Sequence, residues 1–144
     1  MGSVILKRQL ERFSRVLATL LVNGVTIIPS LEVIEQIMEN NIFKKEIEKI
    51  RIDVRDGSSL TKAMNKSKYF PEDIVNIISV GEESGNLEKV LRKISINYEK
   101  ETDRMLKTFT SLLEPLMILV MGSVVAFIIT AMLLPIFQIN FMAR

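Results

Sequence analysis

Residues 112–142 read LLEPLMILVMGSVVAFIITAMLLPIFQINFM, and 23 of these 31 residues are apolar. A run of this length is too long for a buried helix of a soluble domain and is typical of one membrane-spanning helix. Its fifteen Leu, Ile, Val and Phe side chains up to Phe137 favour insertion by about 4–9 kcal/mol, whereas Glu114 costs at most about 3 kcal/mol. The segment therefore predicts a transmembrane helix over residues 112–141.

The rest of the chain has a different composition. Residues 1–107 carry 18 basic and 16 acidic side chains, and beyond them only Glu114 and Arg144 are ionisable. The overall net charge of +2 is too balanced for a protein that binds nucleic acid electrostatically. Because the sequence contains no Cys and no His, disulfides, thiol nucleophiles, the usual zinc sites and imidazole bases are excluded. We therefore expect no enzyme, no cofactor, no metal site and no nucleic-acid partner.

The charges on either side of the apolar run predict its orientation. Lys100, Arg104 and Lys107 precede the run, whereas only Arg144 follows it. Since basic residues are concentrated in the cytoplasmic segments of membrane proteins, we expect the larger part of the chain in the cytoplasm. Residues 142–144 would then form a short extracytoplasmic tail, and the lipid bilayer is the first predicted partner.

Short helices are predicted for the first 111 residues, which contain no alternating pattern long enough for a strand. In the first helix, Leu6, Leu10, Phe13 and Leu17 recur at intervals of three and four, which gives one apolar face. Polar or glycine-containing breaks separate the successive helices at 23–24, 40–41, 56–57, 65–68 and 85–86. The expected fold is all-α: a short antiparallel bundle of about six helices over residues 4–111.

The sixth helix is expected to continue into the membrane. Apolar residues recur along one face of this helix and form a seam of Leu87, Leu91, Ile94, Tyr98, Met105, Phe109 and Leu112. The seam is interrupted at Glu101, where we expect local exposure or a polar partner. No helix-breaking residue separates this seam from the apolar run before Pro115, at which we expect a bend. Pro135 follows about 30 Å further along a helix, which matches the hydrocarbon thickness and marks the end of the span.

The most conspicuous polar cluster is Gly81-Glu82-Glu83-Ser84-Gly85. Adjacent helical carboxylates point about 100° apart, so they do not form an acid–base pair unaided. The simplest interpretation is that Gly81 allows close helix packing, Gly85 ends the helix, and both glutamates face water. A contact of Glu82 and Glu83 with a partner or inside the bundle is the alternative. We therefore take Gly81, Glu82, Glu83 and Gly85 as candidate packing or partner contacts.

Two further candidate contacts lie in or beside the predicted span. Gly122 and Ala126 form a small-xxx-small pair, which lets transmembrane helices approach closely, although small residues are also common in spans for other reasons. Glu114 beside Pro115 places a carboxylate at the membrane border, where it needs water, a lipid headgroup or a partner's cation. We predict a polar contact at Glu114 and a helix–helix contact at Gly122 and Ala126.

Taken together, these segments resemble the type II secretion system F domain family, the inner-membrane platform proteins of type II secretion, type IV pilus assembly and competence systems. The matching segments are FSRVLATLL (13–21), NGV (23–25), GSSL (57–60), FP (70–71), GEESG (81–85), LEP (113–115) and LPIF (134–137). Their order and spacing carry the resemblance, which covers about residues 10–140. Family members usually contain this domain twice and have about three spans. The GEES and LEP motifs resemble those of the second, C-terminal copy.

The resemblance implies a non-enzymatic role at the bacterial inner membrane. Its implied partners are a hexameric assembly ATPase, pilin or pseudopilin subunits, other inner-membrane assembly-platform subunits and further copies of the protein itself. ATPase motion would turn or displace the platform, which would then feed subunits into a filament. This chain has one copy and one span, and residues 1–3 look like an expression scar. We therefore interpret it as a fragment of a longer protein.

Other interpretations are compatible with parts of the sequence. The chain could be a tail-anchored helical signalling or adaptor protein whose span is only an anchor. A membrane-bound enzyme would need a convergent polar site, whereas the acids here are scattered. A divalent cation bound by Asp53, Asp56 and Glu82 is a further alternative, but no ligand spacing supports it.

Overall fold

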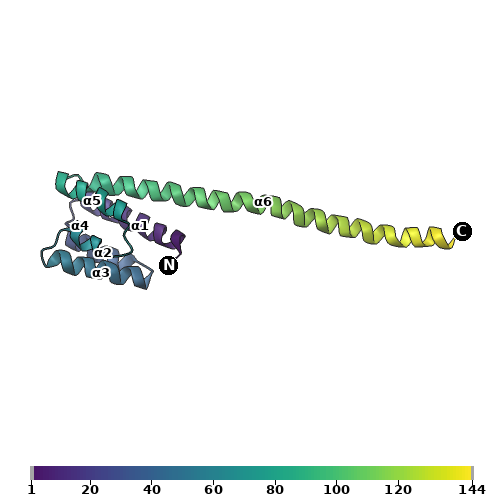
Figure 1. Cartoon of the computed structure of the whole chain (residues 1–144), viewed down its shortest axis with the longest axis horizontal. Coiled ribbons are helices and arrows are strands. Elements are labelled where there is room, and N and C mark those ends of the chain that lie inside the picture. The colour runs from purple at the N-terminus through teal and green to yellow at the C-terminus, as the bar shows by residue number, and fades with distance from the viewer. Residues whose placement is uncertain (1, 144) are drawn as a thin grey trace. The chain divides into compact units, whose positions relative to one another are not determined.

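The computed structural model describes residues 2–143, and helices are the only regular elements in this range (Figure 1). Their bounds are α1 Ser3–Val22, α2 Ile27–Ile37, α3 Asn41–Arg55, α4 Leu60–Asn65, α5 Glu72–Ser84 and α6 Leu87–Met142. The predicted all-α class is confirmed.

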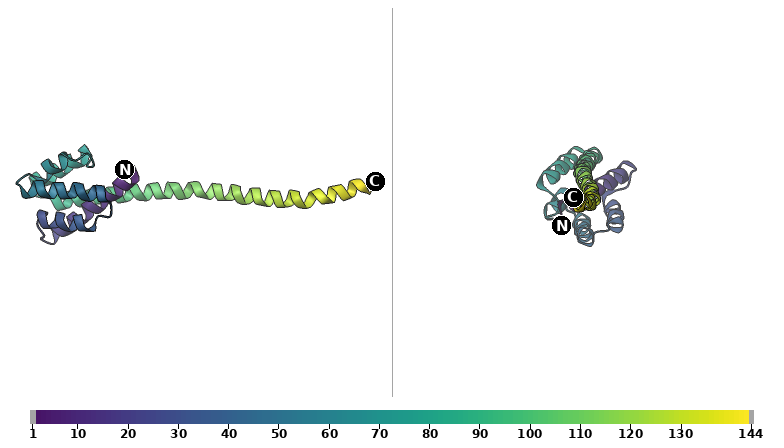
Figure 2. Two further views of the ribbon diagram at one scale, coloured as in Figure 1. Left: turned by 90° about the horizontal axis from the view of Figure 1, so that it is seen from below. Right: turned by 90° about the vertical axis from the view of Figure 1, so that its right-hand side faces the viewer.

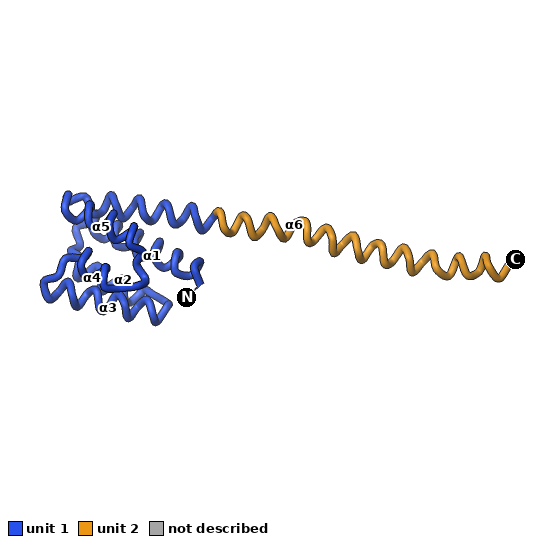
Figure 3. Tube along the Cα trace, viewed as in Figure 1, with its two compact units in different colours: residues 1–103 blue, residues 104–144 orange. Residues whose placement is uncertain are grey.

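The chain divides into two compact units, Met1–Asp103 and Arg104–Arg144 (Figure 3). The first unit, called the bundle below, contains α1 to α5 and the beginning of α6; the second consists of the remainder of α6. Within the bundle, α2 packs on α1 and α3, and α4 packs on α3 and α5 (Figure 2). Hydropathy places the end of the bundle at residue 111, but the compact unit ends at Asp103. The two boundaries differ because residues 106–111 are exposed and add nothing to the core.

Local capping sets the ends of the bundle helices. Asn40 precedes α3, and its Oδ1 accepts hydrogen bonds from the backbone N–H groups of Ile42 and Phe43, both at 3.0 Å. Ser59 precedes α4, and its Oγ accepts from the N–H of Lys62 at 3.2 Å. These side chains satisfy donors that a helix leaves unpaired in its first turn. The helix breaks predicted near residues 40–41 and 56–57 are therefore confirmed.

Three phenylalanines form the centre of the bundle core. The ring of Phe13 in α1 lies 5.2 Å from that of Phe70 and 6.5 Å from that of Phe43 in α3, both in edge-on contacts. The rings of Phe43 and Phe70 are 5.4 Å apart. All three side chains are buried, so this cluster joins α1, α3 and the segment before α5. Such aromatic pairs add about 0.5–1.5 kcal/mol each beyond the burial of their area.

The apolar seam predicted along α6 is buried only in its first half. Leu87, Leu91, Ile94 and Tyr98 belong to the core, whereas the later members are partly or fully exposed: Met105, Phe109 and Leu112. The exposure beyond Tyr98 agrees with the expectation that this helix leaves the bundle before the apolar run begins. A helical period shows that one face is apolar, but it does not show whether another element of the same chain covers it. The expected polar partner at Glu101 is present, because Lys7 Nζ lies 2.7 Å from its carboxylate.

The second unit contains the predicted span. Among the described residues, α6 is the one helix long and apolar enough to cross a membrane, with a mean hydropathy of 2.7 over its most apolar 18 residues and none of them buried. Length and composition thus support the transmembrane helix. The helix runs through Pro115 and Pro135 without interruption. The bend at Pro115 stays a prediction.

Candidate functional site

The end of α5 packs closely against the beginning of α6. Gly81 is buried, and a Cβ atom placed there would lie 3.0 Å from Val90 Cγ2 and 3.2 Å from Leu87 Cα. A larger residue would therefore force the two helices apart. Gly85 ends α5 with a φ of +71°, a left-handed conformation that side chains other than glycine disfavour. The structure thus places Gly81 in the packing between α5 and α6, whereas Gly85 is exposed and ends α5.

Glu82 holds the start of α4. Its carboxylate accepts hydrogen bonds from the N–H of Leu60 at 2.8 Å, the N–H of Thr61 at 3.3 Å and the Thr61 hydroxyl at 2.8 Å. The interpretation that this glutamate faces water is wrong, and the alternative of an internal polar contact describes its geometry. Glu83 is exposed and accepts a hydrogen bond from Ser79 Oγ at 3.2 Å. The two adjacent carboxylates diverge, so they form no acid–base pair.

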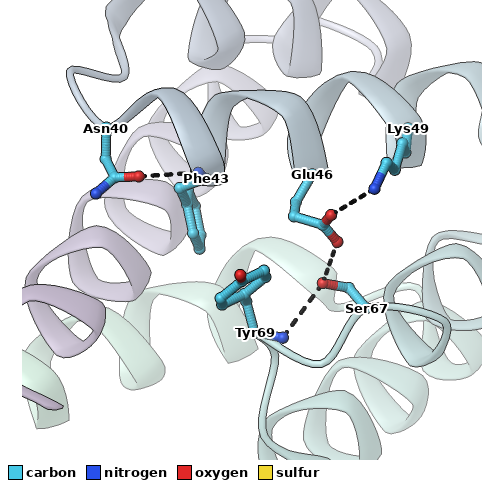
Figure 4. A network of polar contacts seen from close by, with 6 residues as sticks. All are labelled: Asn40, Phe43, Glu46, Lys49, Ser67 and Tyr69. Atoms are coloured by element: carbon cyan, nitrogen blue, oxygen red, sulfur yellow. Dashed lines mark hydrogen bonds and ion pairs between the residues drawn. The ribbon is translucent and has the colours of Figure 1, made fainter. Parts of the chain in front are cut away.

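A second polar network joins α3 to the segment before α5 (Figure 4). The carboxylate of Glu46 accepts from Lys49 Nζ and from Ser67 Oγ, each at 2.7 Å, and Ser67 Oγ accepts from the N–H of Tyr69 at 3.3 Å. This network was not predicted from the sequence. Only the spacing of Glu46 and Lys49, three residues apart on a helix, could have indicated part of it.

Hydrogen bonding shifts the titration of this network. The bonds from Lys49 and Ser67 hold the pKa of Glu46 below its ordinary value of 4.5, although burial acts in the opposite direction. The carboxylate in turn raises the pKa of Lys49. Both groups stay charged at neutral pH, so the network is suited to holding two segments together and not to proton transfer.

We predict that acid weakens the bundle through Glu46. A carboxyl whose pKa is lowered by folding stabilises the folded state above the unfolded pKa, and this contribution is lost as pH falls through the folded value. In urea titrations followed by tyrosine emission, wild type should be more stable than Glu46→Gln at pH 7. The difference should shrink progressively below pH 4.5. A difference that is constant from pH 7 to strongly acidic pH would contradict this role.

Tyr98 ends the buried part of α6. Burial, with smaller contributions from the nearby charges of Asp73 and Glu101, raises the pKa of Tyr98 to about 12. Its phenol therefore stays neutral near pH 7 and acts as a core side chain. Nothing in this geometry offers a base or nucleophile.

The acids named as possible cation ligands are engaged elsewhere. Asp53 Oδ2 pairs with Lys66 Nζ at 2.9 Å, Asp56 lies 3.8 Å from Arg55, and Glu82 caps α4. Between residues 2 and 143 no group of three or more Asp, Glu, His or Cys side chains converges on a possible metal position. The structure therefore does not bring Asp53, Asp56 and Glu82 together.

The candidate contacts in the second unit all lie on exposed helix. Glu114, Pro115, Gly122, Ala126 and Pro135 are exposed, and no side chain of the described residues approaches Gly122 within 4 Å. The neighbouring polar side chains bond to their own helix, Ser123 to the carbonyl of Leu119 and Thr130 to that of Ala126, each at 2.8 Å. The hydroxyls of Ser123 and Thr130 are thus satisfied by their own helix, and the described surface of the span is exposed.

Comparison with known sequences gives the family. The family model that matches the chain describes the type II secretion system (T2SS) protein F, and it matches residues 13–135, which include both the bundle and the span. The chain belongs to this family. The predicted resemblance is therefore confirmed, and with its apolar span the chain is a membrane protein.

Relatives come from both secretion and pilus systems. The chain is 35% identical to the type IV pilus assembly protein PilC of Pseudomonas aeruginosa, over 96% of this chain and 37% of that protein. It is 32% identical to the type II secretion system protein F of the same organism and to PilC of Thermus thermophilus, each over 96% of this chain and 34% of the relative. The chain thus spans about a third of the length of these curated relatives.

Proposed function

We propose that this chain forms part of an inner-membrane platform protein of a type II secretion or type IV pilus assembly machine, and that it is not an enzyme. The observation that carries the proposal is the family match, which runs through the bundle and into the span. The names of the relatives, which include type IV pilus assembly and type II secretion proteins, support both systems. The acidic side chains of the bundle either make hydrogen bonds within it or stand alone, and this supports a binding role over a catalytic one.

In the proposed mechanism, α6 connects the cytoplasm to the membrane. The bundle would lie in the cytoplasm and contact the hexameric assembly ATPase. The span would contact pilin or pseudopilin subunits, other platform subunits and further copies of the protein. Because α6 contributes residues to both units as one helix, a movement of the bundle would reach the membrane through hydrogen-bonded backbone. Pro115 would serve as the joint, since it removes one hydrogen bond from that helix.

Replacing residues 116–134 by an unrelated apolar helix of the same length is expected to abolish pilus assembly or secretion. The replacement keeps the hydrophobicity that inserts the span but removes its specific surface, including Gly122 and Ala126. The measurement is pilus number or secreted substrate in the native host, with the swap made in the full-length gene, together with the amount of protein in the membrane fraction. Normal assembly by the swapped protein would support the anchor interpretation instead.

Glu114→Ala is expected to impair assembly while leaving the protein in the membrane. The carboxylate at the border of the span has no ionic partner among the described residues, so a neighbouring subunit or a headgroup would supply it. Glu114→Gln, which keeps a hydrogen-bonding side chain, is the matched control and should retain part of the function. Pro115→Leu tests the joint in the same assay. Full piliation or secretion with Glu114→Ala would exclude the proposed contact.

A further inference from the structure

A small hollow lies between α5 and the first turns of α6, called the α5–α6 hollow below. Its volume is about 180 Å³, whereas sites for small molecules measure roughly 300–1,000 Å³, so it has room for one long side chain. Three isoleucines and four polar residues line it: Ile74, Ile77 and Ile94, with Asp73, Asn97, Tyr98 and Glu101. All of them belong to the first compact unit, so the hollow is a feature of the bundle alone.

The phenol of Tyr98 gives this hollow an unsatisfied polar group. Tyr98 is only 9% exposed, yet its hydroxyl makes no hydrogen bond with any residue between 2 and 143. Burial, and then the charges of Asp73 and Glu101, raise the pKa of Tyr98, so both carboxylates lie near the phenol. A buried tyrosine hydroxyl normally has a hydrogen-bond partner, which here has to come from outside the described residues.

The charges that line the hollow are both negative. Asp73 is exposed and makes no ion pair within residues 2–143, whereas one carboxylate oxygen of Glu101 lies 2.7 Å from Lys7 Nζ at the edge of the hollow. Further basic residues flank the lining positions along α6 without lining the hollow: Lys93, Lys100 and Arg104. They weaken the attraction of a cation from a distance, but they leave Asp73 and one oxygen of Glu101 without a donor.

We propose that the α5–α6 hollow binds one arginine side chain of a partner protein. The aliphatic part of the arginine would pack on Ile77 and Ile94, and its guanidinium would donate to Asp73, to Tyr98 Oη and to the second oxygen of Glu101. Arginine suits these acceptors better than lysine because they stand on two helices, and a guanidinium offers five donors in a plane. The proposal needs only the bundle and does not rest on a role in secretion or pilus assembly.

A symmetric contact with a second copy of the chain does not supply this arginine. Such a contact uses the same surface on both copies. Helix α5 contains no basic residue, and Arg92 is the one arginine of α6 within the compact bundle. Arg92 precedes Asn97 by five residues, which places it about 140° away around the helix. The two helices that form the hollow thus carry no arginine on this face, and a different protein has to provide it.

Nuclear magnetic resonance of the full chain in neutral detergent micelles tests the proposal, with N-acetyl-arginine amide as the probe. N-acetyl-citrulline amide is the matched control ligand, because it has the same shape without the charge. Wild type is compared with Asp73→Asn and Tyr98→Phe, which nearly keep the volume of the side chain. Glu83→Gln is the control variant, since it removes an exposed acid at the other end of α5.

The arginine probe should bind with a dissociation constant on the order of 1 mM and shift the amide resonances of Ile77 and Asn97. Asp73→Asn and Tyr98→Phe should each weaken binding about three- to tenfold, whereas Glu83→Gln should leave it unchanged. The citrulline probe should bind about tenfold more weakly. Equal binding of the two probes, an equal loss in Glu83→Gln, or no shift up to about 20 mM would overturn the proposal. Self-association of the chain that Asp73→Asn abolishes would assign the hollow to a second copy instead.

Discussion

Replacing Phe13 by alanine is expected to destabilise the bundle by about 3–5 kcal/mol, because it leaves a cavity at the centre of the core. Phe13 is 1% exposed, and its ring contacts the rings of both Phe43 and Phe70. The substitution therefore removes the buried apolar area of the ring and two edge-on aromatic contacts. A small domain is typically stable by only about 5–15 kcal/mol, so the variant should be close to unfolding at physiological temperature.

Urea unfolding in detergent measures this effect on the bundle alone. The sequence contains no tryptophan, and both tyrosines, Tyr69 and Tyr98, lie in the bundle. Their emission therefore reports on this unit and not on the span. Phe109→Ala is the matched control, since that ring is 71% exposed and its loss should change the free energy of unfolding by no more than about 0.5 kcal/mol. Equal effects of the two substitutions would contradict the described core.

Two arginines at the middle of the span are expected to release the chain from the membrane. Val124 and Val125 lie halfway between Pro115 and Pro135. Arginine at the centre of a transmembrane helix costs about 2.5–3.5 kcal/mol, so Val124→Arg with Val125→Arg costs about 5–7 kcal/mol. The gain from the apolar side chains of the span is of the same size, about 4–9 kcal/mol. Insertion should therefore become marginal or unfavourable.

Alkaline carbonate extraction of membranes tests this balance. The wild-type chain should stay in the pellet, and the double-arginine variant should move substantially into the soluble fraction. The control places the same two arginines at Thr108 and Phe109, which precede the apolar run, and this variant should stay in the pellet. Full retention of the mid-span variant would show that residues 112–141 are not held by the bilayer.

The features that follow from short stretches of sequence could be predicted. Asn40 and Ser59 cap the helices that follow them, and Gly85 ends α5, because each acts on backbone groups within a few residues. The span could be predicted for a similar reason, since hydrophobicity over 31 consecutive residues needs no partner from elsewhere in the fold.

The features that depend on distant pairing could not be predicted. Glu82 bonds to a backbone N–H 22 residues away, and Glu46 bonds to a serine 21 residues away. Both look like surface glutamates in their own helices. The residue at which α6 leaves the bundle could not be predicted either, because the apolar period continues through Phe109, where no bundle helix covers it. Candidate contacts at Glu114, Gly122 and Ala126 concern other molecules, and they stay proposals.

We propose that the helical bundle lies in the cytoplasm and that the span of α6 holds it at the membrane, and cysteine accessibility tests this topology most directly. In the cysteine-free chain, Ser84→Cys reports on the bundle and Ala143→Cys on the end of α6. Intact spheroplasts are treated with a membrane-impermeant maleimide. The account predicts labelling at position 143 alone, and labelling at position 84 only after the membrane is opened. Labelling at position 84 in intact spheroplasts, or at neither position until lysis, would contradict it.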